Sequence, residues 1–373
     1  MGKVGKKIKV YPEPRRRVVV AMSGGVDSSV AATLLKRAGF DVVGIMMKFW
    51  RSPELAEGKE GENRCCSVES EKLARLVAKE IGIPFYVLNV EKEFKKKVVD
   101  YFLEEYKKGN TPNPCVVCNK EIKFGLLVEK ALKLGAEFLA TGHYAQTKDG
   151  RLFKGEDKEK DQSYFLWQLS QKQLVHVLFP VGGYTKPEVR KMAKKFKLPT
   201  AETPESQEVC FVSGTINEFL KKYFQPKAGA PRAQKTKPGK IVDITNKILG
   251  KHNGLWFYTI GQRRGLEILQ GPYYVVDKNF RENVLIVSKN EKDLDKKELI
   301  VKSVNWISGK EPKWPLKIKV KIRYRTKEAD ATIYKLPVTG YRLQFLKPQR
   351  AITPGQSAVF YKGEELLGGG IIN

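Results

Sequence analysis

A short stretch near the start of the chain limits the possible folds more than any other feature. The apolar, β-branched residues at 18–22 predict a buried strand, a Ser-Gly-Gly turn follows at 23–25, and an amphipathic helix is expected over 28–38. Such a connection presents backbone N–H groups and the positive end of a helix dipole beyond the strand. Glycine lets a phosphate approach this backbone because no Cβ stands in the way. We therefore expect a phosphate-binding loop.

The residues after the turn narrow the chemistry. A Gly-Gly turn alone is often an ordinary strand–helix connection, but Asp27 and Ser28 follow it in register. The loop lacks the Lys-Ser/Thr pair of a Walker A motif. Ser-Gly-Gly-Val-Asp-Ser instead resembles the PP-loop of enzymes that split ATP into AMP and pyrophosphate. That resemblance implies adenylation of an oxygen atom, with ATP and Mg²⁺ as the small molecules involved.

The order of expected elements predicts an α/β fold. Strands and helices alternate through the first half, with strands at 42–49, 85–90 and 138–142 and helices at 69–81, 91–107, 120–134 and 186–196. Alternation predicts a parallel sheet that binds ligands beyond the carboxyl ends of its strands. The second half offers short strands that indicate a small antiparallel barrel or sandwich, at 273–277, 284–288, 316–326, 331–336, 341–346 and 358–362.

We therefore expect three domains. A parallel-sheet PP-loop domain, of the adenine nucleotide α-hydrolase-like type, would cover residues 1–209. A small central domain would cover 210–292, with a linker or exposed loop at 226–239, and an antiparallel β-barrel would cover 293–373.

The charge of the chain favours a polyanionic partner. Its 373 residues include 69 Lys plus Arg against 41 Asp plus Glu, a net charge of +28. Basic side chains release counterions when they neutralise phosphates, so nucleic acid is the expected partner, although a generally lysine-rich surface is an alternative. Residues 316–325 alternate apolar and basic, which predicts a strand with five cations on one face. That face is either solvated or a track for a phosphate backbone.

The cysteine content and hydropathy favour a reducing cytoplasm. Five cysteines in a chain of this length do not form a disulfide framework. The basic start lacks the apolar stretch of a secretory signal, and no segment approaches the ~18 apolar residues of a membrane span. The protein is expected to be cytoplasmic, without a membrane partner, and monomeric.

Three of the cysteines are candidates for chemistry. Cys115 and Cys118 lie in a proline-rich loop before a predicted helix, where a helix dipole would stabilise a thiolate. Cys210 lies far away in the sequence. Cys65 and Cys66 lie in a polar loop, and they could equally well be buried packing residues without a chemical role. Without a second Cys-x-x-Cys or zinc-finger histidine spacing, a structural zinc is not expected.

Taken together, the motifs resemble the tRNA-specific 2-thiouridylases, the MnmA family, over almost the whole chain. The matching segments are Ala-Met-Ser-Gly-Gly-Val-Asp-Ser at 21–28, Met-Lys at 47–48, Thr-Pro-Asn-Pro at 111–114, Cys-Asn-Lys-Glu-Ile-Lys-Phe at 118–124, Ala-Thr-Gly-His-Tyr-Ala at 140–145, Lys-Asp-Gln-Ser-Tyr-Phe-Leu at 160–166, Ser-Gln-Glu-Val-Cys-Phe at 206–211, Tyr-Thr-Ile-Gly-Gln-Arg-Arg-Gly-Leu at 258–266 and Thr-Pro-Gly-Gln at 353–356. The resemblance implies ATP-dependent replacement of the 2-carbonyl oxygen of a tRNA wobble uridine by sulfur. It also implies glutamate, glutamine and lysine tRNAs as substrates, and a cysteine desulfurase or sulfur-relay protein as sulfur donor.

The resemblance also implies residue roles. Cys210 matches the persulfide carrier, and Cys118 the thiol that resolves the persulfide or releases sulfide. ATP would be held by Ala21, Met22, Ser23, Gly24, Gly25, Val26, Asp27, Ser28, Met47 and Gly142. The target base would meet Asn113, Pro114 and Cys115, and the tRNA would meet His143, Lys160, Asp161, Gln162, Arg323, Tyr324 and Gln356. The wobble base is expected to leave the anticodon stack to be reached.

One departure leaves the mechanism open. The best-known members carry Asp where this chain has Cys115, so a carboxylate that could assist proton transfer is absent. Cys115, Cys118 and Cys210 could instead hold an iron–sulfur cluster with one open iron site.

Rival interpretations are other PP-loop enzymes, such as GMP, NAD, argininosuccinate and lysidine synthetases, and a nucleic-acid-binding module with a relic nucleotide loop. None of these uses the Cys118/Cys210 pair.

Overall fold

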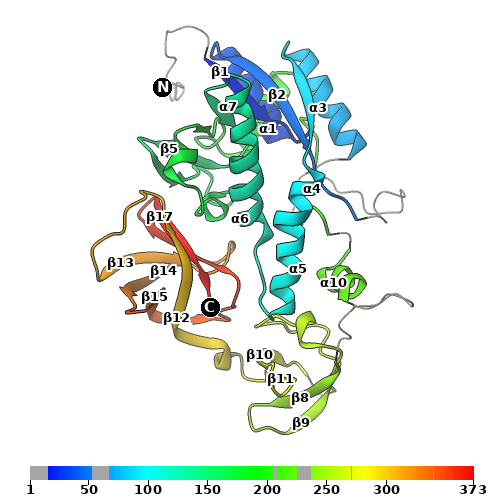
Figure 1. The fold of residues 1–373 in the computed structure, drawn as a ribbon, viewed down its shortest axis with the longest axis vertical. Helices are drawn as coiled ribbons and strands as arrows, with labels where there is room; N and C mark the ends of the chain where they lie inside the picture. The colour runs from blue at the N-terminus through cyan, green and yellow to red at the C-terminus, as the bar shows by residue number, and fades with distance from the viewer. Residues whose placement is uncertain are drawn as a thin grey trace.

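Three sheets organise the molecule, which a computed structural model describes over residues 16–52, 67–204, 209–212, 214–224, 237–269, 271–338 and 340–373 (Figure 1). Cys65, Cys66, residues 206–208 and most of the expected linker at 226–239 lie outside these ranges. No helix within the described ranges is long and apolar enough to cross a membrane.

The first sheet is parallel, as the alternation predicts. Its order is β3-β2-β1-β4-β7, with β1 at Arg17–Ala21, β2 at Asp41–Lys48, β3 at Phe85–Asn89, β4 at Phe138–Ala140 and the unexpected β7 at Val177–Leu178. Val18 to Val20 are buried and pair with β2 on one side and β4 on the other, so β1 is the centre of the sheet. The carboxyl ends of β1 and β4 therefore reach the same edge.

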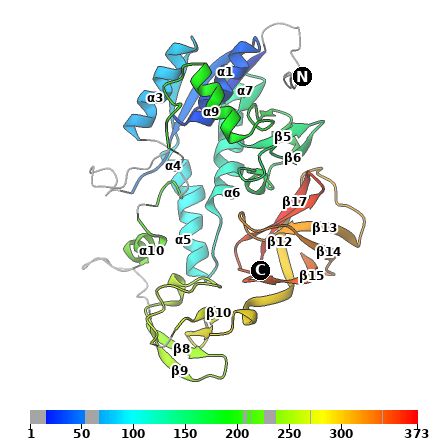
Figure 2. The same ribbon diagram turned by 180° about the vertical axis from the view of Figure 1, so that it is seen from behind.

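Helices cover this sheet. They are α1 at Val26–Arg37, α3 at Val68–Glu80, α7 at Leu127–Lys133 and α9 at Lys186–Lys195. Figure 1 shows α7 in front of the sheet, and Figure 2, from behind, shows α1 and α9 on the opposite face. Helix α1 begins two residues before the expected start at 28, so Asp27 as well as Ser28 belongs to its first turn.

Two long helices expected as regular α-helices contain π-helical segments. The first consists of α4 at Glu91–Phe94, η1 at Lys95–Val99 and α5 at Asp100–Lys107. The second consists of α6 at Pro114–Cys118, η2 at Asn119–Leu126 and then α7. A π-turn changes which side chains share a helix face, which a 3.6-residue period does not anticipate. Shorter elements complete the helical set: η3 at Ser163–Phe165, α8 at Gln171–Leu174, α10 at Ile216–Phe224, η4 at Leu255–Phe257 and η5 at Glu291–Leu294.

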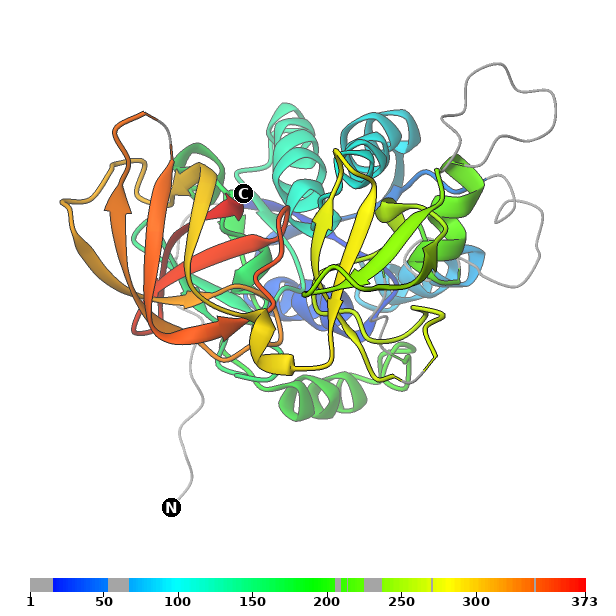
Figure 3. The same cartoon turned by 90° about the horizontal axis from the view of Figure 1, so that it is seen from below.

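The central sheet has the order β10-β11-β8-β9. Its strands are β8 at Gly239–Asp243, β9 at Ile248–His252, β10 at Tyr274–Asn279 and β11 at Val284–Ser288. Only β10 and β11 were expected from the sequence. Figure 3, seen from below, shows this central sheet beside the C-terminal sheet, which is described next.

The third sheet closes into an antiparallel barrel, because β12 pairs with both β15 and β17. Its strands are β12 at Asp295–Trp306, β13 at Leu316–Lys321, β14 at Ala329–Lys335, β15 at Tyr341–Arg350, β16 at Ser357–Lys362 and β17 at Glu365–Ile372. It has a hydrophobic core of its own, which includes Val301, Ile333 and Phe360. The barrel expectation is confirmed, although β12 and β17, which close it, were missed.

A hairpin from the first domain extends the barrel sheet. Strands β5 at Ala145–Lys148 and β6 at Arg151–Lys154 pair with each other, and β6 pairs with β17. This places a segment from the first domain in the same sheet as the last strand of the chain.

The expected row of five cations on residues 316–325 is wrong. Strand β13 ends at Lys321, and the next residues form bends and turns. Arg323 turns inward and donates to the carbonyl oxygens of Ile260 and Ala351 and to Thr353 Oγ1. Alternation predicted the strand correctly as far as Lys321, but tertiary hydrogen bonds decided where it stops.

Candidate active site

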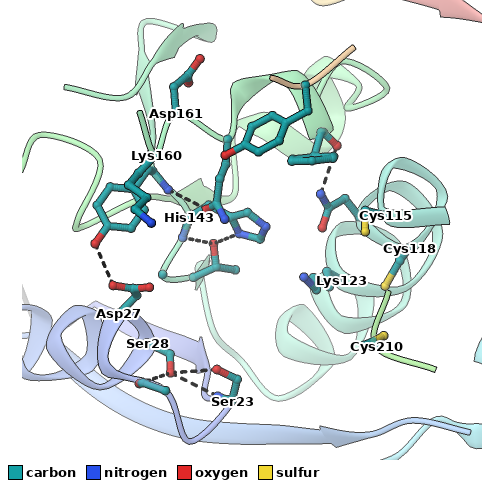
Figure 4. A pocket seen from close by; sticks show the side chains of 18 of the residues that line it. Ser23, Asp27, Ser28, Cys115, Cys118, Lys123, His143, Lys160, Asp161 and Cys210 are labelled. Atoms are coloured by element: carbon teal, nitrogen blue, oxygen red, sulfur yellow. Dashed lines mark hydrogen bonds between the residues drawn. The ribbon is translucent and has the colours of Figure 1, made fainter. Parts of the chain in front are cut away.

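One cavity of about 1340 Å³ lies beyond the carboxyl ends of β1, β2 and β4 (Figure 4). It exceeds the ~300–1,000 Å³ typical of a small-molecule pocket, so a nucleotide and a second reactant could share it. Most predicted site residues line it: Ala21 to Ser28, Met47, Pro114, Cys115, Cys118, Gly142, His143, Lys160, Asp161, Gln162, Cys210 and Tyr324. Asn113, Arg323 and Gln356 do not.

The Ser-Gly-Gly loop is shaped by close backbone contacts. Gly24 has φ of +75°, and a Cβ there would lie 2.2 Å from the carbonyl oxygen of Ser70, so only glycine fits. The Ser28 hydroxyl accepts from the Ser23 N–H at 3.2 Å and donates to the Gly25 carbonyl at 3.1 Å. The sequence places these residues in one loop, and the hydrogen bonds fix its shape.

Gly142 lies on the wall of the cavity that faces the Ser-Gly-Gly loop. A Cβ on this residue would lie 2.7 Å from the backbone nitrogen of Ser28. The end of β4 therefore packs directly against the first turn of α1, which keeps the two carboxyl ends together at the cavity.

Asp27 is held by two residues that the sequence did not identify. The Lys186 ammonium donates to both oxygens of the Asp27 carboxylate at 2.8 Å, and the Tyr144 hydroxyl donates to Oδ1 at 2.7 Å. The Lys186 side chain is only 8% exposed, whereas that of Asp27 is 30% exposed and faces the cavity. A lysine directly after the capping Thr185 of α9 is a weak sequence signal, and it becomes informative only once the fold brings it to Asp27.

Cys115, Cys118 and Cys210 lie on the opposite side of the cavity, and none of the three forms a disulfide. Cys115 lies in the first turn of α6 and Cys118 is its last residue. Figure 4 shows Cys118 and Cys210 directed toward the same part of the cavity. Burial raises the pKa of the Cys115 thiol, and the positive charge of Lys123 only partly opposes this. Desolvation therefore opposes the thiolate stabilisation expected from the helix start, and that stabilisation stays a prediction for Cys115, which is exposed to the cavity.

The described residues contain no group of three or more His, Cys, Asp or Glu side chains placed to hold a metal ion. The three thiols would be a suitable donor set for iron, but they are not placed as a group that could hold a metal ion.

His143 is a neutral group in this cavity. Its pKa lies well below the usual value, mainly because of burial and in smaller part because of the charge of Lys123. Its Nδ1 is paired with the Thr141 hydroxyl at 2.8 Å, and the Phe124 and Phe179 rings pack nearby. A neutral imidazole can accept or donate one hydrogen bond without bringing a charge into the site.

The segment at 160–162 is partly structural. Asp161 is buried and accepts hydrogen bonds from the backbone N–H groups of Gly155 and Ser163. Gln162 accepts from the backbone N–H of Tyr144 at 3.0 Å, which positions the start of the β5–β6 hairpin. Cationic residues line the nearby wall, namely Lys154, Lys158, Lys160, Lys321, Arg325 and Lys327. Tyr324, also on this wall, packs against Phe165 with ring centroids 4.6 Å apart.

Gln356 holds the loop between α5 and α6 in place. Its side-chain amide donates to the carbonyl oxygen of Thr111 at 2.7 Å and lies 3.4 Å from that of Pro112. The Thr111 N–H also donates to the Pro354 carbonyl oxygen at 2.9 Å. The barrel thereby anchors the loop that leads to Asn113 and Cys115.

Known proteins match the chain over almost its full length. It is 47% identical over 372 residues to tRNA-specific 2-thiouridylase MnmA 2 of Thermoanaerobacter sp. (strain X514), covering 96% of this chain and 98% of that protein. The chain belongs to the tRNA-specific 2-thiouridylase MnmA family. The MnmA of Clostridioides difficile (strain 630) is 46% identical, and that of Carboxydothermus hydrogenoformans is 45% identical, each with 96% of this chain and 98% of the relative covered.

Family models match the three parts of this MnmA-family chain. They are described as a tRNA methyl transferase HUP domain at residues 16–214, a tRNA methyl transferase PRC-barrel domain at 217–289 and an aminomethyltransferase beta-barrel domain at 296–372. A solved complex of a 4-thiouridine synthetase with RNA and bound ATP is 18% identical over 52% of this chain and 45% of that one, with a TM-score of 0.33, a likeness too weak to carry an argument.

Proposed function

We propose that this protein is a tRNA-uridine 2-sulfurtransferase that converts the wobble uridine of glutamate, glutamine and lysine tRNAs to 2-thiouridine, releasing AMP and pyrophosphate. The observation that carries the proposal is a single cavity that joins the Ser-Gly-Gly loop to Cys118 and Cys210. Other adenylating PP-loop enzymes need the loop but not the thiols. The family membership supports the same activity.

ATP would lie along the loop, with its phosphates at the backbone N–H groups of residues 23–28 and its adenosine near Ala21, Met47 and Gly142. Mg²⁺ binds through carboxylates together with phosphate oxygens, and the partly exposed Asp27 offers such a carboxylate. When bound, Mg²⁺ would neutralise charge on the departing pyrophosphate. Lys186 and Tyr144 orient the carboxylate for this task.

Adenylation converts the uridine 2-oxygen into a leaving group, and sulfur then displaces AMP. The terminal sulfur of a Cys210 persulfide attacks C2, and AMP leaves with the electron pair of the C2–O bond. The Cys118 thiolate attacks Sγ of Cys210, breaks the S–S bond and forms a disulfide, while the released sulfur stays on C2 as the thiocarbonyl. An external thiol reduces the disulfide for the next cycle. Release of free sulfide by Cys118, before the attack on C2, is the alternative route.

The tRNA would approach over the cationic wall of the cavity. Asn113, Pro114 and Cys115 would meet the flipped base, and His143, Lys160, Asp161, Gln162, Arg323, Tyr324 and Gln356 would lie near the anticodon arm. Because Arg323 and Gln356 already donate to backbone carbonyls, we expect them to shape the RNA-facing surface as much as to touch RNA.

We also propose that the protein is a cytoplasmic monomer with domain boundaries near residues 209 and 292. A cysteine desulfurase or a sulfur-relay protein would supply its sulfur.

A mass-spectrometric assay tests the function. Unmodified glutamate or lysine tRNA is incubated with the protein, Mg-ATP and a sulfur donor, alongside Cys118→Ala, Cys210→Ala and Cys115→Ala. We expect an oxygen-to-sulfur mass increase at the wobble uridine that is lost in the first two variants and kept in the third. No increase with the wild-type protein under anaerobic conditions and with a working donor would contradict the proposal. An iron-loaded protein whose activity also requires Cys115 would instead revive the cluster mechanism.

A further inference from the structure

Lys123 brings a positive charge to the side of the cavity that holds the thiols, and the mechanism above does not use it. Lys123 lies on the π-helical segment η2, five positions after Cys118 at the end of α6. A π-turn closes between residues five apart, so it brings Lys123 toward the face that carries Cys118. Both residues line the cavity, and Figure 4 shows Lys123 between His143 and the Cys118–Cys210 side.

The charge of Lys123 acts on its neighbours. It lowers the pKa of the Cys115 thiol against the effect of burial, and it adds to the lowering of the pKa of His143. Both groups are therefore within electrostatic reach of the ammonium. A group that favours anions and disfavours cations at two neighbouring positions defines a locally positive part of the cavity.

Within the described part of the chain, no carboxylate pairs with Lys123, in contrast to Lys186 and Lys154, which also line the cavity. Lys186 is paired with Asp27, and Lys154 with Glu328. An ammonium that is directed into a cavity and lacks a carboxylate partner can attract an incoming anion. In the proposed reaction, the anions near the thiols are the persulfide of Cys210 and the thiolate of Cys118.

We propose that Lys123 stabilises the anionic sulfur at Cys118 and Cys210 that is transferred to the tRNA base. This inference rests on the proposed function for the identity of the reaction, but the positive potential at the thiols can be tested without it. Even at the dielectric of water, an ammonium within a few ångströms of an anion raises the local concentration of that anion about 3- to 10-fold.

Alkylation with two reagents measures this potential at each cysteine. The reduced full-length protein is treated with iodoacetate, an anion, and with the neutral iodoacetamide, and modification is followed by peptide mass spectrometry. Lys123→Gln is expected to lower the iodoacetate-to-iodoacetamide rate ratio at Cys118 and Cys210 about 3- to 10-fold, while Lys123→Arg keeps it. The exposed Lys120→Gln, on the same helical segment, is the control and is expected to change nothing. Equal ratios in Lys123→Gln and wild type would overturn the proposal.

Partial reactions locate the effect in the catalytic cycle. Lys123→Gln and Lys123→Met are expected to release pyrophosphate at nearly the wild-type rate with tRNA and ATP, but to thiolate at least 10-fold more slowly, with recovery in Lys123→Arg. Weakened tRNA binding or an equal loss of pyrophosphate release would assign Lys123 to a phosphate group instead and overturn the proposal. If the wild-type protein does not thiolate tRNA at all, the proposed function fails, whereas the alkylation ratios still decide the role of Lys123.

Discussion

Individual residues in this cavity are held by contacts that span the chain. Asp27 is fixed by Lys186, which lies 159 positions away, and by Tyr144, which lies 117 positions away. Removing one partner of a buried ion pair leaves the other charge without compensation, which costs more than the pair itself contributes. Lys186 is therefore predicted to matter both for stability and for the orientation of the Asp27 carboxylate.

Lys186→Met tests this pair. We expect a loss of about 1–3 kcal/mol in the free energy of unfolding, since Asp27 is partly exposed and solvent reduces the penalty. ATP-dependent pyrophosphate release should fall at least 10-fold because the carboxylate is no longer oriented. Urea unfolding and a pyrophosphate assay provide the readouts, with the exposed Lys191→Met on the same helix as the control. Wild-type pyrophosphate release in Lys186→Met would contradict the assigned role.

Gly142→Ala tests the close contact between β4 and α1. The added Cβ would lie 2.7 Å from the Ser28 nitrogen, so the loop must shift, at a cost of about 1–3 kcal/mol. We expect weaker ATP binding by calorimetry and slower pyrophosphate release. Gly183→Ala is the matched control, because its Cβ would meet no atom within 4 Å. If the two variants behave alike, close packing at residue 142 does not shape the nucleotide site.

At the scale of elements, the strand–turn–helix unit could be predicted because its signals are local. An apolar run, two glycines and polar residues at a helix start determine β1, the loop and α1 within a few positions. The π-segments η1 and η2 could not be predicted, since nothing in a 3.6-residue pattern distinguishes them from α-helix. Lys123 was missed as a site residue for this reason, although it stands inside a recognised motif.

Gln356→Leu tests how the residue just before the barrel strand β16 supports the loop between α5 and α6. Loss of the hydrogen bonds to Thr111 and Pro112 should let the base-binding loop move, so kcat for thiolation should fall about 10-fold with little change in the Kd for tRNA. Steady-state kinetics and a filter-binding assay measure the two quantities. The exposed Gln344→Leu, on β15, serves as the control. A weaker Kd with an unchanged kcat would show instead that Gln356 acts by direct contact with RNA.

At the scale of the whole molecule, a half-buried lysine joins the central domain to the loop after α5. The Lys278 ammonium donates to the carbonyl oxygens of Gly109 and Tyr258, and burial lowers its pKa to about 8. The same loop receives contacts from the barrel, so all three domains meet beside the segment that leads to the cysteines.

Lys278 predicts a pH dependence of stability. Its folded-state pKa of about 8 lies below the value of 10.5 for an unperturbed lysine, so the unfolded chain binds more protons between these values. Below pH 8 the ammonium is charged in both states, and its desolvation destabilises the folded protein in full. By linkage, the free energy of unfolding rises as the pH increases from about 8 to 10.5, by up to about 3 kcal/mol. The unfolding free energy of wild type minus that of Lys278→Met, measured by urea unfolding, should rise by about 2.5 kcal/mol from pH 7 to 10. The same difference for the exposed Lys289→Met should stay flat, and a flat curve for both would contradict the assignment.

The sequence alone determined the parallel sheet, the phosphate-binding loop, the barrel class and the thiols that serve as candidates for sulfur chemistry, because hydrophobic period, turn residues and motif spacing are written along the chain. Tertiary structure decided what depends on distant partners: the closure of the barrel by β12 and β17, the inward turn of Arg323, the Lys186–Asp27 pair and the place of Lys123 among the thiols. The physical reason is that desolvation and long-range pairing depend on which segments meet in space, and local sequence patterns do not encode those meetings.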